Sequence, residues 1–332
     1  MRVAGGNRPP SSKMIYLICR FVLGVQPHES SEGSPVSMQD IAVIGAGRMG
    51  RPMVDRLVAA GYAPVVHARR PETQAAVKAA GLRWAGSIAE TVRDADLVLT
   101  VVFDEAQLRS VTLGRGGALA AMKPGSILVQ HTTCDPAVMT GIERAATAYG
   151  IEVLDAAVSG TPRDIAAGQL TVWAGGPEAT LDRARAALGT YASPVLSVGP
   201  VGHGQRVKLV NNALFVAQVG LAVEAVRIAA GVGLSEADVL AALQHGSGAS
   251  RALSAVAWIG AGNVGPRLSE FMIKDVDAVR AIAERAQVDL GLLGDVLDSA
   301  AVREGVLNRG IAADRDLAAR SRVEPGAIKS EP

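Results

Sequence analysis

Three glycines follow a short apolar run in the segment "IAVIGAGRMGRPMVDRLVAAGY" (residues 41–62). Gly45, Gly47 and Gly50 form the pattern G-x-G-x-x-G between a predicted strand and a predicted helix. In that setting the first glycine permits a tight turn, the second lets the backbone approach a pyrophosphate, and the third allows close helix–strand packing. Free backbone amides at the start of a helix also attract negative charge. The pattern therefore predicts a dinucleotide-binding turn with these contact residues: Gly45, Ala46, Gly47, Arg48, Met49 and Gly50.

The end of the second predicted strand indicates which dinucleotide fits. NAD sites of this type usually place an acidic residue there, which binds the ribose hydroxyls. The segment "HARRPE" instead places Arg69 and Arg70 at that position, and Glu72 follows later. Two guanidinium groups attract a 2′-phosphate and can bind it through paired hydrogen bonds. We therefore expect NADP as the cofactor, with NAD as the second choice; the alternative is that both arginines are ordinary surface charges.

A lysine and an asparagine share one face of a long apolar segment, residues 205–233. Lys208 and Asn212 are four residues apart. The segment contains no proline and ends in Gly231 and Gly233, as expected of a single helix. A lysine within an apolar helix is costly unless it is paired or takes part in chemistry. Lys208 is therefore a candidate functional residue; the alternative is a lysine whose amine reaches the surface at the start of the helix.

Strands and helices alternate through the first half of the chain. Predicted strands occupy residues 41–44, 63–69, 96–102, 126–130, 151–158, 170–176 and 194–198. Helical periodicity follows most of them. This alternation predicts a doubly wound, Rossmann-type α/β domain with a parallel sheet and right-handed crossovers.

The second half of the chain is predicted to be helical, with helices at residues 205–233, 235–244 and 271–287. The first of these is apolar nearly all round and must be buried on several sides, so we expect an all-α domain built round it. The predicted organisation is an N-terminal extension (1–37), a dinucleotide-binding domain (38–201) and a helical substrate and dimerisation domain (202–325). We expect the extension to be disordered; it either resembles a targeting segment or precedes the true start near Met38.

Composition excludes several classes of protein. The 33 basic and 32 acidic residues nearly cancel, which argues against a nucleic-acid partner. The apolar run at residues 14–25 is interrupted by Arg20 and is shorter than the ~18 residues that span a bilayer, so no membrane partner is expected. Cys19 and Cys134 lie far apart and lack metal-ligand spacing, so we expect a cytoplasmic protein without disulfides or bound metal.

Taken together, four ordered segments resemble the β-hydroxyacid dehydrogenases, the group that contains 3-hydroxyisobutyrate dehydrogenase and the glyoxylate and tartronate-semialdehyde reductases. They are "IAVIGAGRMGRPM" (41–53), "DAAVSGTPRDIAAGQLTVWAGG" (155–176), "GPVGHGQRVKLVNNALF" (199–215) and "FMIKDVDAV" (271–279). "HTTCDP" (131–136) also resembles a turn of this family. The resemblance covers roughly residues 38–320.

The resemblance implies a role for each matched residue. Lys208 would be the catalytic acid and base, moving a proton at the substrate oxygen while hydride is transferred at the adjacent carbon. Asn212 would hydrogen-bond the substrate, and Ser159 with the amide of Gly160 would bind its carboxylate. The alternatives are purely structural: a helix-packing role for Asn212 and a turn-forming role for Ser159.

Other matched residues would surround the cofactor. Val102, Phe103 and Thr133 map onto positions that line the nicotinamide, and Lys274 maps onto a lysine that closes over cofactor and substrate, with Asp275 orienting it. The alternatives are a core position for Phe103, a helix cap for Thr133, and a surface ion pair for Lys274 with Asp275.

Two departures from the family pattern affect the substrate pocket. Thr161 and Pro162 stand where the family usually repeats glycine, and Ala157 replaces a proline. Since proline has no N–H to donate, the carboxylate-binding turn is expected to be reshaped.

We therefore expect an NADP-preferring dehydrogenase or reductase of a small carboxylate-bearing β-hydroxy acid or aldehyde. Imine reduction is an alternative, but the resembling imine reductases usually replace the lysine that Lys208 matches. A non-catalytic dinucleotide-binding interaction protein and a sugar-phosphate dehydrogenase are further alternatives. The long apolar helix also predicts a homodimer or homotetramer through the helical domain.

Overall fold

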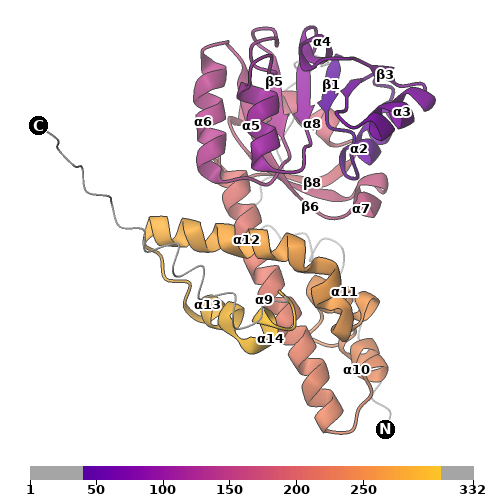
Figure 1. Cartoon of the computed structure of the whole chain (residues 1–332), viewed down its shortest axis with the longest axis vertical. Helices are drawn as coiled ribbons and strands as arrows, with labels where there is room; N and C mark the ends of the chain where they lie inside the picture. Colours follow the sequence, from indigo (N-terminus) through magenta and orange to yellow (C-terminus); the bar gives the residue numbers. More distant parts are fainter. Residues whose placement is uncertain (1–39, 308–332) are drawn as a thin grey trace, which may run out of the picture. The chain divides into compact units, whose positions relative to one another are not determined.

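The computed structural model describes residues 40–307, and the side chains of all of these except residues 267–271 (Figure 1). The expected disorder of residues 1–37 and the last part of the predicted helical domain lie outside the described residues. All described residues belong to one compact unit.

Eight strands form one sheet in the order β3-β2-β1-β4-β5-β6-β7-β8. The strands are β1 Ile41–Ile44, β2 Val65–His67, β3 Arg83–Trp84, β4 Leu97–Thr100, β5 Ile127–Gln130, β6 Glu152–Ser159, β7 Leu170–Gly175 and β8 Ala192–Ser197. The order of the first six strands is that of dinucleotide-binding α/β domains, which confirms the predicted fold. The strand β3 was not predicted, because two residues show no periodicity.

The sheet is not wholly parallel as predicted. Six of its seven strand pairings are parallel, and the pairing of β6 with β7 is antiparallel. Only residues 160–169 connect these two strands, and they contain the short helix α7 (Pro162–Ala166). A connection of this length is too short for the usual crossover between parallel strands, so the chain turns back on itself.

Helices cover both faces of the sheet. They are α2 Gly50–Ala59, α3 Pro71–Ala79, α4 Ile88–Val92, α5 Glu105–Leu113, α6 Pro136–Thr147 and α8 Glu178–Leu188. Ile41 and Val43 of β1 pack in one core with α2 and α8, whereas Ala42 and Ile44 pack in a second core with α5 and α6. Burial on both faces explains why β1 is a continuous apolar run rather than an alternating one.

The helical part is built round α9 (His203–Gly231), as predicted. The other helices are α10 Glu236–Leu243, α11 Arg251–Ile259, α12 Val264–Ala286, α13 Gly291–Asp298 and α14 Ala300–Arg303, with a 3-10 turn at Ala261–Asn263. A side chain at Gly220 would meet the Val302 Cγ2 atom at 2.2 Å, so α14 packs directly against the backbone of α9. The helix α12 begins at Val264 rather than at residue 271 as predicted.

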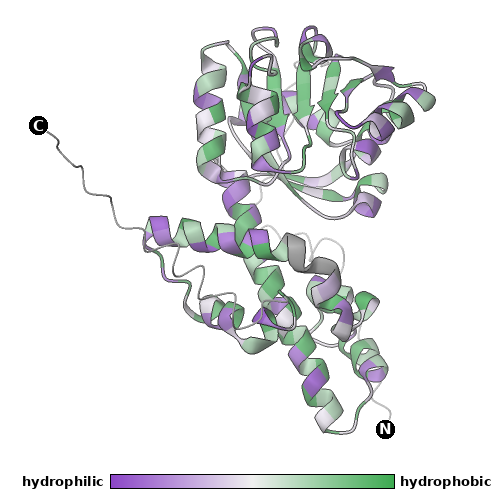
Figure 2. Cartoon of the chain, viewed as in Figure 1, coloured by the Kyte–Doolittle hydropathy of each residue, from purple (hydrophilic) through white to green (hydrophobic). Residues whose placement is uncertain are grey.

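Among the described residues, α9 is long and apolar enough to cross a membrane by length and composition alone. The expectation of no membrane partner rested on the length of uninterrupted apolar runs, and α9 by itself meets the length and composition of a membrane span. Figure 2 shows hydrophobic residues along much of α9 and in the strands of the sheet. The inward face of α9, which includes Leu209, Val216 and Val226, packs with α10, α11, α12 and α14 in one core. Its apolar composition is therefore explained as that of a central core helix.

Candidate active site

The glycine-rich turn is held tightly against the end of β4. Gly45 has a φ of +103°, and a side chain there would lie 2.2 Å from the Val101 carbonyl oxygen. A side chain at Gly50 would lie 1.9 Å from the Gly45 carbonyl oxygen. Both positions therefore require glycine, one for its backbone conformation and both for space.

Gly47, by contrast, faces open space beside an arginine. The nearest neighbouring atom to a side chain at Gly47 would be Nη2 of Arg70, at 3.8 Å. Arg70 is largely exposed and pairs loosely with Glu72, Nε to Oε1 3.5 Å, and Arg69 beside it is exposed. An uncovered backbone turn at the start of α2, with a guanidinium next to it, fits the phosphates of a dinucleotide.

Two loops meet beside this turn, at the expected nicotinamide side. The Thr132 hydroxyl accepts a hydrogen bond from the Val102 N–H at 3.0 Å and donates one to the Val102 carbonyl at 3.1 Å. Thr133 follows and is partly buried, while Asp135 caps α6, so Thr133 is not the helix cap. Phe103 is 64% exposed, which rules out the core position.

Lys208 lies in a polar cluster between α9 and α12. Asn212, one turn further along α9, donates a hydrogen bond from Nδ2 to Oδ2 of Asp275 at 2.5 Å. Asn211 in turn donates to the Asn212 side-chain oxygen at 3.0 Å. Asp275 was expected to orient Lys274, which is exposed; the hydrogen bond found for it goes to Asn212.

The surroundings of Lys208 change its proton affinity. Burial lowers the pKa of Lys208, the nearby Asp275 carboxylate partly opposes that change, and the Lys274 ammonium adds to it. The net direction is downward, so the amine gives up its proton more readily than an exposed lysine. The structure thus brings together Lys208, Asn212, Lys274 and Asp275.

Ser159 and Gly160 lie at the end of β6, where the chain enters the reshaped turn. The Thr161 N–H and hydroxyl both donate to Asp164 Oδ2, at 2.7 and 2.8 Å, in a capping box at the start of α7. The Thr161 amide is therefore engaged within the protein. Although burial opposes it, these hydrogen bonds hold the pKa of Asp164 below its ordinary value, with help from Arg251 and Arg163.

The Asp164 carboxylate also lies close to Gly160. A side chain at Gly160, which has a φ of +138°, would lie 3.1 Å from Asp164 Oδ2. The departure from the family pattern at Thr161 and Pro162 thus brings an internal negative charge next to the expected carboxylate-binding amide. The signal was present in the sequence, since Thr161 and Asp164 have capping-box spacing.

Two buried polar residues near the site were not identified from the sequence. Asp155 and Gln205 are both fully buried, and Gln205 donates from N and Nε2 to the two Asp155 oxygens at 2.9 and 2.8 Å. Burial raises the pKa of Asp155 to about 6. Burial also lowers the pKa of His131 to about 4, and this ring bonds the Ala156 carbonyl and the Tyr191 hydroxyl.

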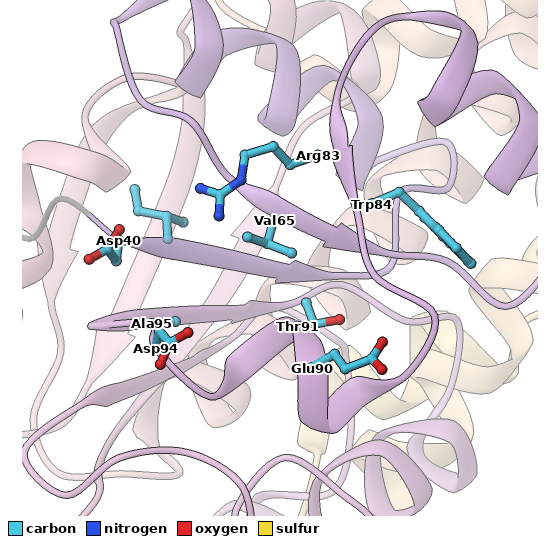
Figure 3. Close-up of a pocket in the computed structure, with 9 residues that line it drawn as sticks. Asp40, Val65, Arg83, Trp84, Glu90, Thr91, Asp94 and Ala95 are labelled. Carbon is cyan, nitrogen blue, oxygen red and sulfur yellow. The ribbon is translucent and has the colours of Figure 1, made fainter.

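A cavity of about 370 Å³ lies elsewhere (Figure 3). Its lining includes Asp40, Val65 and Arg83, which precede or begin β1, β2 and β3. These are the amino ends of the strands, whereas ligands of open α/β sheets bind at the carboxyl ends. This cavity is therefore not the dinucleotide site.

Comparisons with known proteins agree with this geometry. Residues 40–199 match the NAD-binding domain of 6-phosphogluconate dehydrogenase, and residues 202–319 match the NAD-binding domain of NADP-dependent 3-hydroxyisobutyrate dehydrogenase. The NAD-dependent L-serine dehydrogenase of Pseudomonas aeruginosa is 31% identical over 293 residues, which cover 84% of this chain and 98% of that enzyme. The chain belongs to the β-hydroxyacid dehydrogenase family.

Solved structures place the fold in the same family. A 3-hydroxyisobutyrate dehydrogenase of Mycobacterium tuberculosis, solved with L-serine, superimposes with a TM-score of 0.69 and 27% identity, covering 79% of this chain and 92% of that one. An imine reductase from Myxococcus stipitatus gives a TM-score of 0.53 at 22% identity, covering 80% and 93%, and shares the fold alone. The protein is accordingly a hydroxyacid dehydrogenase that uses a nicotinamide dinucleotide.

Proposed function

We propose that this β-hydroxyacid dehydrogenase prefers NADP and interconverts a small β-hydroxy acid and the matching semialdehyde or keto acid, with Lys208 as the acid and base. The observation that carries the proposal is the position of Lys208: a partly buried amine of lowered pKa, in one cluster with Asn212 and Asp275. A catalytic amine needs a pKa near the working pH, and burial moves it in that direction.

Each residue then has a defined task. The bound nicotinamide supplies a hydride in reduction and accepts one in oxidation. Lys208 donates a proton to the substrate oxygen in reduction and takes it back in oxidation. Asn212 holds that oxygen through a hydrogen bond, and Asp275 fixes the orientation of the Asn212 amide.

The remaining contacts bind the two ligands. Ser159 and the Gly160 amide bind the substrate carboxylate, and Lys274 closes over substrate and cofactor. The pyrophosphate is bound by the turn from Gly45 to Gly50, and the 2′-phosphate by Arg69 and Arg70. The nicotinamide is lined by Val102, Phe103 and Thr133.

A substrate screen tests the proposal. Glyoxylate, succinic semialdehyde, methylmalonate semialdehyde, their hydroxy acids and L-serine are assayed with both cofactors, and a cyclic imine is included. We expect turnover of at least one hydroxy acid or aldehyde acid, with Lys208→Ala losing at least about 100-fold in kcat, the lower end of a single acid–base contribution. Lys78→Ala, which removes a lysine that stacks on Trp84 in the sheet domain, is the matched control.

Two results would count against this proposal. Turnover of the imine alone would favour imine reduction. A Lys208→Ala variant as fast as the parent enzyme would remove the acid–base role.

We also propose that the protein forms a homodimer or homotetramer through α9. Leu214, Leu221 and Ile228 are each about half exposed and lie seven residues apart, so they form one apolar stripe along the helix. A second copy of the chain would remove this stripe from water, because a symmetric contact pairs the same surface on both subunits.

A further inference from the structure

Gln205 is a buried residue in the first turn of α9, and its side chain joins α9 to two other segments of the chain, residues 132–134 and β6. Its Nε2 group donates to Asp155 Oδ1 at 2.8 Å and to the Thr132 carbonyl at 3.2 Å. Its Oε1 atom accepts a hydrogen bond from the Cys134 N–H at 3.0 Å. Gln205 is 0% exposed, and both polar atoms of its side chain have hydrogen-bond partners within the protein.

Each of the three segments leads directly to an expected active-site residue. Thr132 and Cys134 flank Thr133 on the nicotinamide side. Asp155 lies on β6, whose last residue is Ser159. Gln205 itself precedes Lys208 by three residues, just under one helical turn. One side chain therefore ties together the parts of the site that must be aligned for reaction.

The first turn of α9 also packs on the sheet at this point. A side chain at Gly204 would lie 2.4 Å from the Asp155 carbonyl oxygen and 2.6 Å from the Trp173 carbonyl oxygen. The helix backbone thus lies directly on β6 and β7, and the Gln205 side chain sets its position relative to the end of β5.

Only a carboxamide of this length meets all three requirements. The side chain must donate twice and accept once within one plane, which a carboxylate, an amine or a hydrocarbon cannot do. Gln130 also donates to the Thr132 carbonyl, at 2.8 Å, so that carbonyl keeps a partner when Gln205 is replaced. The Asp155 carboxylate keeps the hydrogen bond from the backbone N–H of residue 205, whereas the Cys134 N–H loses its bond to the side chain. A Gln205 variant should therefore fold with reduced stability, while the link between α9 and the loop is lost.

We propose that Gln205 is a positioning residue: it fixes the start of α9, and with it Lys208, against the Thr132–Cys134 segment, so that proton and hydride transfer are aligned. This inference rests on the proposed role of Lys208. Reacting groups displaced by about 1 Å can cost 10²-fold in rate, so the consequence is expected in kcat rather than in ligand binding.

The test compares Gln205→Leu with Gln218→Leu, a glutamine on the same helix beyond the polar cluster. For Gln205→Leu we expect kcat to fall about 10- to 100-fold, while the KM for substrate and the Kd for NADPH change less than about threefold. With deuterated NADPH, the primary isotope effect should rise, because hydride transfer becomes rate-limiting. Gln218→Leu should lose thermal stability at most and keep kcat.

A second readout needs no bound cofactor. The pKa of Lys208, measured by NMR on the enzyme with ¹³C-methylated lysines, should rise toward its ordinary value in Gln205→Leu, because the amine becomes less tightly enclosed. It should not change in Gln218→Leu.

An exchange of the two partners tests the hydrogen-bond geometry. Gln205→Glu alone places a second carboxylate in contact with that of Asp155, and kcat should fall. The double variant Gln205→Glu/Asp155→Asn restores a donor and an acceptor with the total charge of the parent, and should recover part of kcat. Failure of the double variant to exceed the single one would contradict the proposed geometry.

Lys208→Ala is assayed alongside to separate the two proposals. If Lys208→Ala is slow and Gln205→Leu has the parent kcat with a lower Tm, Gln205 is merely structural and the inference is wrong, while the proposed function stands. If Lys208→Ala retains the parent kcat, the proposed function fails, and the alignment role of Gln205 fails with it.

Discussion

The Asn212 amide donates a hydrogen bond to the Asp275 carboxylate across a 2.5 Å separation, and this contact joins α9 to α12 next to Lys208. The two residues are 63 positions apart in the chain. Their pairing gives the Asn212 side chain one orientation, with its oxygen facing Asn211. It also places a negative charge near the candidate catalytic amine, where it opposes the effect of burial on the pKa of Lys208.

Replacing Asp275 with asparagine should shift the pH profile of the reduction reaction. Reduction requires the protonated amine of Lys208, so kcat/KM falls as the pH rises through the pKa of that group. The Asp275 carboxylate raises this pKa; without it, the fall should occur at lower pH. The measurement is kcat/KM against pH for Asp275→Asn and for the exposed control Asp182→Asn, and an unchanged profile would show that Asp275 does not act on Lys208.

Arg70 should determine the preference for NADPH. It lies beside the glycine-rich turn, 3.8 Å from where a Gly47 side chain would be. A hydrogen bond to a charged group contributes about 1.5–3 kcal/mol, so Arg70→Ala should raise the Kd for NADPH at least about tenfold and leave that for NADH nearly unchanged. Arg83→Ala, at the amino ends of the strands, is the control. Equal weakening of both cofactors would mean that Arg70 binds the pyrophosphate rather than the 2′-phosphate.

Asp164 should weaken the binding of anionic substrates. Its carboxylate lies near Gly160 and holds the Thr161 amide. Asp164→Asn keeps an acceptor for the Thr161 N–H and removes the charge, so KM for a carboxylate substrate should fall severalfold with kcat nearly constant. Steady-state kinetics provide the measurement. Unchanged KM would place the substrate carboxylate away from this turn.

Two buried groups should act oppositely on stability between about pH 4 and 6. In the folded protein the pKa of Asp155 is raised from 3.8 to about 6, so the folded state binds the proton more tightly and stability falls as the pH rises through this window. The pKa of His131 is lowered from 6.5 to about 4, so the unfolded state binds the proton more tightly and stability rises with pH. Each difference corresponds to about 3 kcal/mol, and the two nearly cancel.

Variants at these positions separate the two effects. Asp155→Asn should make the free energy of unfolding drop by about 3 kcal/mol between pH 6.5 and 4, because only His131 then contributes. His131→Asn should give the opposite slope between pH 6 and 4. Urea unfolding across this range measures both slopes, and parallel curves for the two variants would contradict the assignment.

The apolar stripe on α9 should hold subunits together. Leu221 is 57% exposed in the single chain, so Leu221→Glu places a charge on the contact without disturbing the inner core. We expect the variant to sediment as a monomer at micromolar concentration and the parent as a dimer or tetramer. Val58→Glu, an exposed apolar residue of α2, is the control. A parent protein that is itself monomeric would refute the proposed assembly.

Local features were predictable from the sequence because neighbouring residues decide them. The turn at Gly45 and Gly50 needs residues without side chains, and the pattern of glycines between a strand and a helix predicts it. The length of α9 follows from an apolar segment that contains no proline and ends in glycines, and the common face of Lys208 and Asn212 follows from their helical spacing. The capping box of Thr161 and Asp164 is equally local and was overlooked, although its spacing is visible.

The partners of the polar residues depend on the tertiary structure. Gln205 bonds Asp155, 50 residues away, and the Thr132 carbonyl, 73 residues away. Asn212 bonds Asp275 on another helix. The antiparallel direction of β7 also depends on the tertiary structure, because the short connection after β6 brings the chain back in the opposite direction. By itself, the sequence determines which segments become strands, helices and the phosphate-binding turn, because these follow from the conformational preferences of adjacent residues. The packed fold alone decides which buried polar groups meet, because each one must find a partner among whatever distant segments the core brings within hydrogen-bond distance.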